Sequence, residues 1–237
     1  MPRRAADIKL VTLEHDTLQE RAYEELRNAL MSGAMRPGHV LSYRSLARAL
    51  GTSPMPVRDA VRRLITERAL EARPNRAIVV PQLTREQIEE IYKIRIALEG
   101  LAASEAARFV TDEDIAELRG YEEAMEAATR ADNVRKYVDN NWRFHFKVYG
   151  LANMPQLLEA IKSLWLQIGP MLNTQLAAFD HHQSAIKALV RRDGEAARTA
   201  IAMDLGEARA TLIKQMETAA EAQLDSTRTA ARAKRAR

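Results

Sequence analysis

The sequence predicts a mainly α-helical protein in which an N-terminal winged helix-turn-helix is followed by an all-α helical bundle. Two observations predict the N-terminal part. A short apolar helix, a glycine and a basic helix follow one another, and two strand-like segments come directly after them. A third observation predicts the bundle, because the apolar residues after Pro81 recur only at helical spacing. The chain has 237 residues, which is enough for two hydrophobic cores.

The first two helices are expected at residues 18–32 and 43–50. Thr17 and Glu20 have the spacing of a capping box, in which each side chain bonds the backbone of the other residue at a helix start. The second helix has a short apolar face, and Gly51 ends it. The apolar face is formed by Leu41, Leu46, Ala49 and Leu50.

The third helix is expected at residues 54–68. Ser53 suits its N-cap, and Pro54 suits its first turn, where a missing N–H costs nothing. Arg58 and Arg62 lie on the face opposite the apolar one. The residues that this spacing turns inward are Val57, Ala60, Val61, Leu64 and Ile65.

Two short strands, Leu70–Arg73 and Ala77–Val80, are expected on either side of a turn at residues 74–76. Together with the helices they complete a winged helix-turn-helix, a unit that binds double-stranded DNA. Residues 43–76 contain eight arginines and three acidic residues, and arginine binds both phosphate and guanine. The alternative is a small helical core with a solvated basic face.

The charge differs between regions of the chain. An N-terminal arm, residues 1–16, has balanced charges, and the winged helix-turn-helix, residues 17–82, has 11 arginines and 6 acids. The helical domain that follows, residues 83–225, has a net charge of −6. The last segment, residues 226–237, has five basic residues and no acid, and we expect it to be a disordered tail. A basic N-terminal domain on an acidic body indicates that one end of the molecule binds nucleic acid.

The body is expected to contain six helices. Thr84 and Gln87 form a second capping box, and Thr111 precedes three acids that suit a helix start. Gly169 and Pro170 are expected to kink or break the helix that contains them. The expected helices are 84–109, 112–129, 132–150, 154–178, 180–191 and 194–222.

Composition excludes several classes of protein. The chain has no cysteine, which excludes disulfides and thiolate metal sites and favours a reducing cytoplasm. No apolar run reaches the length of about 18 residues that a membrane-spanning helix needs. The N-terminal residues are charged throughout and contain no apolar signal sequence. We therefore expect a cytoplasmic protein that does not contact a membrane.

The N-terminal motifs resemble the DNA-binding domain of GntR-type bacterial transcription regulators, over about residues 17–81. The Pro-Val-Arg run after a serine cap is a fairly specific signal in this context. The residues that carry the resemblance are Pro37–Gly38, the run from Leu41 to Gly51, Ser53, Pro56–Val57–Arg58 and Pro74–Asn75–Arg76.

The resemblance also implies which residues face DNA. Two departures from the family pattern concern these residues. Pro54 and Met55 stand where arginine or threonine is common, and Ala77 follows the wing where glycine is frequent. The residues implied to contact DNA are Arg44, Ser53, Met55 and Arg58, with Asn75 and Arg76 in the wing.

The body resembles the FCD ligand-binding domain found in the FadR-type branch of these regulators, over about residues 84–215. Each motif is short, and their order behind a GntR-type domain gives the resemblance its strength. The motifs are Tyr92 to Glu99 followed by alanines, Phe144–His145, and the block from His182 through Asp193 to Asp204–Leu205.

Four polar residues of the body are candidates for a divalent metal site. Asn141 and His145 are four residues apart and share one helix face, while His182 and Asp204 lie on two later helices and can converge with them. Imidazole with carboxylate or amide oxygen suits zinc first, and also manganese or nickel. The neighbouring His181 is expected to face solvent.

The FCD resemblance supports this metal site. Metal-binding FCD domains usually present Asp-x3-His on one helix and two later histidines. Here Asn141 stands at the aspartate position and Asp204 at the last histidine position. The single negative ligand charge has therefore moved rather than disappeared. The alternative is a polar pocket in which the histidines are hydrogen-bonded and no metal binds.

Arg95 is the candidate for binding an effector. It lies on one strip of its helix with Tyr92 and Glu99, and an inward-facing arginine binds a carboxylate by paired hydrogen bonds. The alternative is an ordinary Arg95–Glu99 helix pair, worth about 0.3–0.5 kcal/mol. Trp142, Trp165 and Tyr149 are expected either to line a pocket or to belong to the core.

The function predicted from these features is that of a ligand-responsive transcription regulator. A homodimer is expected to place two recognition helices in successive major grooves of a palindromic operator. A small organic acid, bridged by a metal, is expected to bind the body and change the pose of the DNA-binding domains. One alternative is a metal-ion-responsive regulator, and a remote one is a metal-dependent hydrolase that uses His145, His182 and Asp204.

Overall fold

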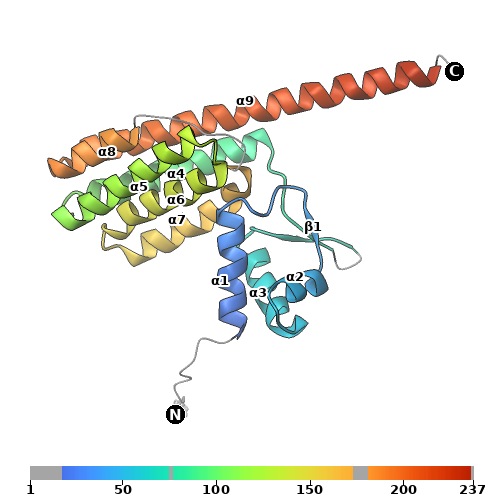
Figure 1. Cartoon of the computed structure of the whole chain (residues 1–237), viewed down its shortest axis with the longest axis horizontal. Helices are drawn as coiled ribbons and strands as arrows, with labels where there is room; N and C mark the ends of the chain where they lie inside the picture. Colours follow the sequence, from blue (N-terminus) through green and yellow to red (C-terminus); the bar gives the residue numbers. More distant parts are fainter. Residues whose placement is uncertain (1–17, 75–76, 173–180, 236–237) are drawn as a thin grey trace, which may run out of the picture.

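The computed structural model describes residues 18–74, 77–172 and 181–235, with the backbone alone in 220–235. Two parts are visible in Figure 1: a small N-terminal domain around α1 to α3, and a helical bundle from which α9 projects. No helix in the described part of the chain is long and apolar enough to span a membrane.

The N-terminal domain contains three helices and three short strands. The order is helix, strand, two helices and then two strands, so the predicted fold of this part is confirmed. The elements are α1 (Leu18–Met31), β1 (Val40–Leu41), α2 (Tyr43–Ala49), α3 (Pro54–Thr66), β2 (Glu71–Ala72) and β3 (Ile78–Val79).

The turn between α2 and α3 is built as the sequence predicts, with one difference. Gly51 has φ +62°, a conformation that favours glycine, and Pro54 occupies the first turn of α3. Ser53 stands at the N-cap, but its side chain makes no capping hydrogen bond. α2 also starts with a capping box, formed by Ser42 and Ser45, which was not predicted.

The sheet has three strands in the order β1-β3-β2, and both pairings are antiparallel. The sequence predicted only the two wing strands. β1 was missed because its two residues, of which Val40 is exposed, are too few to show alternation. Asn75 and Arg76, at the tip of the wing, lie outside the described residues.

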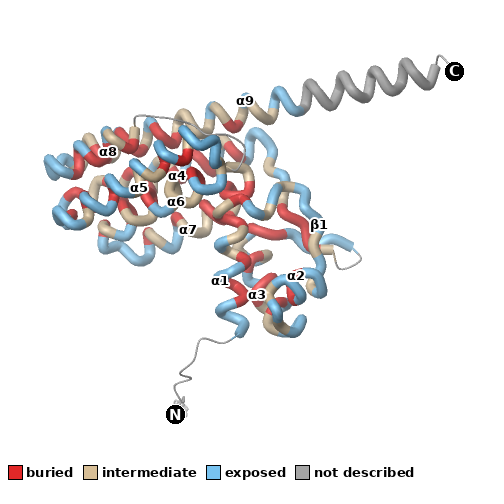
Figure 2. Tube along the Cα trace, in the orientation of Figure 1, coloured by how far each residue is buried: buried red, intermediate tan, exposed pale blue. Residues whose placement is uncertain are grey.

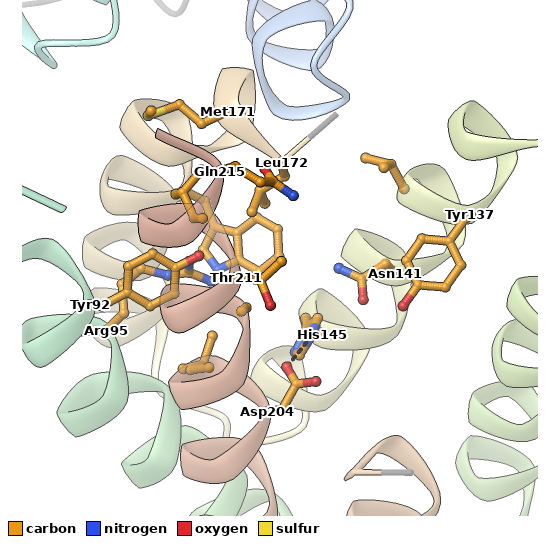
Figure 3. Close-up of a pocket in the computed structure, with 15 residues that line it drawn as sticks. Tyr92, Arg95, Tyr137, Asn141, His145, Met171, Leu172, Asp204, Thr211 and Gln215 are labelled. Atoms are coloured by element: carbon orange, nitrogen blue, oxygen red, sulfur yellow. Dashed lines mark ion pairs between the residues drawn. The ribbon is translucent and has the colours of Figure 1, made fainter. Parts of the chain in front are cut away.

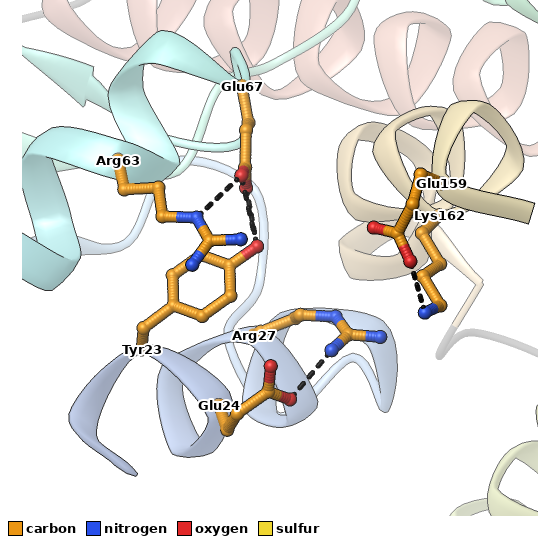
Figure 4. A network of polar contacts seen from close by, with 7 residues as sticks. All are labelled: Tyr23, Glu24, Arg27, Arg63, Glu67, Glu159 and Lys162. Atoms are coloured by element: carbon orange, nitrogen blue, oxygen red, sulfur yellow. Dashed lines mark hydrogen bonds and ion pairs between the residues drawn. The ribbon is translucent and has the colours of Figure 1, made fainter. Parts of the chain in front are cut away.

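A polar network joins α1 to the end of the recognition helix α3 (Figure 4). The Tyr23 hydroxyl donates to Glu67 at 2.9 and 3.0 Å, and Arg63 donates to the same carboxylate at 3.2 Å. The Arg63 guanidinium also stacks on the Tyr23 ring, 3.7 Å from its centroid. Burial and the hydrogen bond to Glu67 raise the pKa of Tyr23 to about 12. This network fixes the orientation of α3 on α1.

The body is the predicted all-α bundle. α4 packs along α9, α5 against α6, and α8 against α9. Buried positions run along the inward faces of these helices, as Figure 2 shows. The elements are α4 (Arg85–Ala106), α5 (Asp112–Arg130), α6 (Val134–Gly150), α7 (Pro155–Ile168), the 3-10 turn η2 (Gly169–Met171), α8 (His181–Val190) and α9 (Gly194–Arg235).

The predicted break at Gly169 and Pro170 is confirmed, whereas the predicted end of α9 is wrong. α7 ends at Ile168 and the chain tightens into η2, because Pro170 cannot continue the hydrogen-bond ladder. The helix end predicted at 178 lies outside the described residues. α9 was predicted to end at 222, with a disordered tail from 226, but its backbone is helical to Arg235. Residues 220–235 contain no glycine or proline that would end it.

The two parts of the molecule contact each other closely at η2. A Cβ atom added to Gly169 would lie 2.8 Å from the Cα of Met31 and 2.9 Å from the carbonyl oxygen of Leu30. The backbone of η2 therefore rests directly on the C-terminal end of α1. Glycine is required at 169 because any larger residue would push these two backbones apart.

Candidate metal centre and DNA-binding surface

The predicted DNA-contact residues of α2 and α3 lie on the surface. Arg44, Ser53, Met55 and Arg58 are all exposed, Met55 to 69%. The Arg58 guanidinium lies 5.3 Å from the centre of the Tyr43 ring and makes no ion pair with any described residue. An exposed arginine without an acidic partner is available to phosphate or to a base edge.

The other arginines of α3 are already paired. Arg62 bonds Asp59 at 3.2 Å, and Arg63 is held by Glu67 and by the Tyr23 ring. The unpaired Ser53 hydroxyl lies at the N-terminus of α3, where the helix dipole attracts anions. The start of α3, rather than its end, therefore carries polar groups that no other described residue pairs with.

Three of the four predicted metal ligands converge inside the bundle. His145 comes from α6, His182 from the first turn of α8, and Asp204 from α9. All three are buried, and their ligand atoms lie within 4.8 Å of one another. Asn141, one turn before His145 on α6, is half-buried and lines the same pocket (Figure 3).

The distances in this cluster fit a bound cation. Nε2 of His145 lies 3.4 Å from Nε2 of His182 and 3.3 Å from a carboxylate oxygen of Asp204. Nε2 of His182 lies 3.7 Å from the other oxygen of Asp204. An imidazole nitrogen that carries no proton is an acceptor, and so is a carboxylate oxygen. Two acceptors this close repel each other unless a proton or a cation lies between them. Two imidazoles and a carboxylate are a ligand set that zinc accepts, with a position left open.

The charge states of the cluster also suit a metal ion. Burial lowers the pKa of His182 to about 4, so its ring is neutral at pH 7. For Asp204, burial acts to raise the pKa. The polar contact with His145 and the charges that the histidines carry when protonated outweigh that effect and lower the pKa of Asp204 to about 2. A neutral histidine and an ionised aspartate are the forms that bind metal.

The second polar feature of the pocket is a chain of buried side chains behind His145. Arg95 donates to Glu99 at 2.6 and 3.3 Å, and the Tyr149 hydroxyl donates to Glu99 at 2.5 Å. The same hydroxyl lies 2.9 Å from Nδ1 of His145. Arg95 was predicted either to face inward and bind a carboxylate or to form an ordinary helix pair with Glu99. They form an ion pair, and it is fully buried.

Both parts of the chain match known bacterial regulators. Residues 18–80 match the model of the gntR family of bacterial regulatory proteins, and residues 90–207 match the FCD domain. The HTH-type transcriptional regulator McbR of Escherichia coli K12 is 31% identical over 212 residues, which cover 86% of this chain and 96% of McbR. The chain belongs to the gntR family of bacterial regulatory proteins.

Solved structures of GntR regulators agree with this fold. The structure of E. coli McbR/YncC has a TM-score of 0.79 and 32% identity, over 84% of this chain and 99% of that one. A GntR transcriptional regulator of Rhodococcus sp. RHA1 has a TM-score of 0.68 at 23% identity, over 83% of this chain and 97% of that chain, and shows the same fold. The relatives are DNA-binding transcription regulators and not enzymes, so the hydrolase alternative is wrong.

The pocket of this GntR regulator is lined by both groups of candidate residues (Figure 3). His145, Asp204 and Asn141 form one side, and Arg95 and Tyr92 the other. Three buried donors around the pocket have no hydrogen-bond partner among the described residues. They are the Tyr92 hydroxyl, Nη1 of Arg95 and Nε1 of Trp165. Buried donors without partners normally have one in the functional state, so these atoms point to a ligand that accepts hydrogen bonds.

Sequence reasoning placed some of these residues incorrectly or left them undecided. His181 was predicted to face solvent, but it is half-buried and lies 3.0 Å from a carboxylate oxygen of Glu207. Trp165 lines the pocket, whereas Trp142 packs on Phe146 outside it. Tyr149 is buried and bonds His145. Its spacing of four residues from His145 was the available signal.

The metal-free protein is expected to lose stability as the pH falls from about 6.5 to about 4. The pKa of His182 is about 4 in the folded protein and about 6.5 in the unfolded chain, so in this window only the unfolded chain binds the proton. The cost reaches on the order of 3 kcal/mol at the lower end. Urea unfolding of chelator-treated protein at pH 7 and pH 5 measures the part of this loss that falls between the two pH values.

His182→Gln is the matched control for this pH dependence. Asp204 stays ionised over the whole interval because its pKa is about 2, so the difference between the variant and the wild type reports His182. The stability of the variant should change less between pH 7 and pH 5. An equal change in both proteins would show that His182 does not titrate as described.

Proposed function

We propose that this regulator controls transcription in response to a small carboxylate effector that binds a divalent ion, zinc first, in the pocket of the FCD domain. The observation that carries the proposal is the arrangement of the pocket. A buried cluster that suits a metal ion lies opposite buried donors that have no partners. The ion would be held by His145, His182 and Asp204, with Asn141 beside them, and it would supply an open coordination position for a ligand oxygen.

The charges of the pocket support a metal-dependent effector. Glu99 and Asp204 are negative, Arg95 is positive, and His182 is neutral, so these buried groups carry a net charge of −1 without an ion. A divalent ion changes the net charge to +1. An organic acid would then be attracted to the pocket, whereas without the ion it would meet a negative site.

The contact at Gly169 supports a route from the pocket to the DNA-binding domain. Met171 and Leu172 line the pocket, and Gly169, two residues earlier, rests on the end of α1. α1 is in turn joined to α3 through Tyr23 and Glu67. A ligand that shifts η2 would therefore shift the recognition helix.

The test begins with DNA sites selected by the protein from a random pool. Affinity for the selected site is then measured with a panel of small organic acids, with zinc and with a chelator. We expect at least one acid to change DNA affinity by roughly 5- to 150-fold, the range of typical allosteric coupling, and only when zinc is present. Gly169→Ala should reduce that change while the acid still binds. An acid that acts equally with the chelator would contradict the metal-bridged mechanism.

A second candidate is a regulator for which the ion itself is the signal. The observation in its favour is that Glu99 already occupies two nitrogens of Arg95, which leaves only Nη1 for a ligand. The same experiment separates the two proposals. If zinc alone changes DNA affinity and no acid adds to the change, the regulator responds to the ion.

The DNA-binding form is proposed to be a homodimer on a palindromic operator. A single winged helix-turn-helix contacts too few base pairs for useful specificity, and two domains related by a two-fold axis double the site. Sedimentation at micromolar concentration should give twice the chain mass of 26.7 kDa. A monomer both with and without DNA would contradict this proposal.

A further inference from the structure

We infer that Tyr149, held by Glu99, is a positioning residue that fixes the ring of His145 with Nε2 directed at the metal site. The inference rests on the proposed function, because it concerns the same metal centre. It is carried by one continuous chain of side chains from Arg95 through Glu99 and Tyr149 to His145. Each of the four residues is at most 1% exposed.

The direction of each hydrogen bond in the chain follows from the number of protons available. Tyr149 has a single hydroxyl proton, and its shorter contact, 2.5 Å, is to the charged oxygen of Glu99. The hydroxyl therefore donates to Glu99. Its oxygen, 2.9 Å from Nδ1 of His145, is left as an acceptor, so Nδ1 carries a proton and donates it to Tyr149.

A proton on Nδ1 leaves Nε2 as the nitrogen that can bind metal. Nε2 is the atom that faces His182 and Asp204, at 3.4 and 3.3 Å. Metal-bound histidines commonly donate their other ring N–H to a fixed acceptor, which sets the tautomer and the ring orientation. Here the acceptor is a tyrosine oxygen. Glu99 keeps it oriented, and Arg95 neutralises that carboxylate inside the protein.

Tyr149 reaches His145 because the two are four residues apart on α6 and share one face of that helix. Glu99 reaches Tyr149 from α4, so the chain also joins two helices of the bundle. Without the hydroxyl, Nδ1 would lose its acceptor. The ring could then hold its proton on Nε2, where Asp204 accepts it, and this form cannot bind metal through Nε2.

The test compares Tyr149→Phe with Tyr121→Phe. The Tyr121 hydroxyl also donates to a glutamate, Glu117 at 2.6 Å, but on α5 and away from the pocket, which makes it a matched control. Zinc affinity is measured by competition with a chromogenic chelator. We expect Tyr149→Phe to bind zinc about 10- to 100-fold more weakly, the range typical for loss of a group that supports a metal ligand. Tyr121→Phe should change zinc affinity less than about threefold, because the hydrogen bond that it removes lies outside the pocket.

A second measurement uses the wild-type protein and does not depend on whether a variant folds. Nitrogen-15 NMR of the zinc-loaded protein identifies which ring nitrogen of His145 carries a proton, and we expect Nδ1. A proton on Nε2, or equal zinc affinities of Tyr149→Phe and wild type, would overturn the inference and leave the proposed function intact. A wild-type protein that binds no zinc would overturn both.

Discussion

Arg58→Ala is expected to weaken binding to the selected DNA site by about 1–3 kcal/mol, which is roughly 5- to 150-fold. Arg58 lies exposed near the start of α3, and no described acidic residue pairs with it. If it binds a base edge, the variant should also lose preference at one position of each half-site. Fluorescence anisotropy with the selected duplex and its point variants measures both effects.

Two controls make the Arg58 prediction specific. Arg130→Ala removes another exposed arginine, from α5 in the body, and should leave DNA affinity unchanged. Wild-type affinity should fall steeply as salt increases, because arginine–phosphate contacts release counterions. If Arg58→Ala binds the site normally, or if binding is insensitive to salt, the assignment of this surface is incorrect.

The largest expected effect is on metal content. His145→Ala and His182→Ala should each reduce zinc from about one ion per chain to near zero after loading and desalting. Each removes a directly ligating nitrogen, and its loss should exceed the 10- to 100-fold weakening seen when only a supporting group is lost. The carboxylate left behind would lie buried beside a single imidazole, an arrangement that compensates its charge poorly.

His181→Ala is the matched control for the metal prediction. His181 is adjacent to His182 in the sequence, but it pairs with Glu207 outside the cluster. Its removal should leave the zinc content unchanged. Equal and near-zero zinc in the wild type and in both ligand variants would mean that the histidines are only polar residues of the pocket.

The N-terminal domain could be predicted largely from sequence because its signals are local. A glycine with positive φ, a proline in the first turn and an apolar face at helical spacing each act within a few residues. The predictions that failed depend on distant contacts or on weak signals. β1 exists because Val40 pairs with Val79, and two residues of sequence do not indicate such a pairing. The end of α9 was missed because its residues have no sharp stop signal.

The ligands of the metal site could be predicted from the sequence, but the hydrogen-bonded side chains behind His145 could not. His145, His182 and Asp204 were identified from residue type and from family resemblance, and the fold brings them together. The chain behind His145 joins α4 to α6, and sequence spacing shows only contacts within one helix. Spacing therefore indicates the Arg95–Glu99 pair and the contact of Tyr149 with His145, but it gives no indication of the bond between Tyr149 and Glu99 that connects them.

The contact between Gly169 and the end of α1 is a second feature that the sequence does not indicate. The sequence predicted a kink at Gly169 and Pro170, and the chain does tighten there. The reason that a glycine is needed lies 138 residues away in the sequence, where the backbone of Met31 comes into contact with it. A contact between two domains has no local signal in either of them.

The most direct test of the metal centre is anomalous diffraction from crystals of the zinc-loaded protein, with data collected on both sides of the zinc absorption edge. We predict one strong anomalous peak per chain inside the bundle, about 2.0–2.2 Å from Nε2 of His145, Nε2 of His182 and a carboxylate oxygen of Asp204. A loaded crystal with no peak in this pocket, or with zinc bound only at surface residues, would contradict a metal centre at His145, His182 and Asp204.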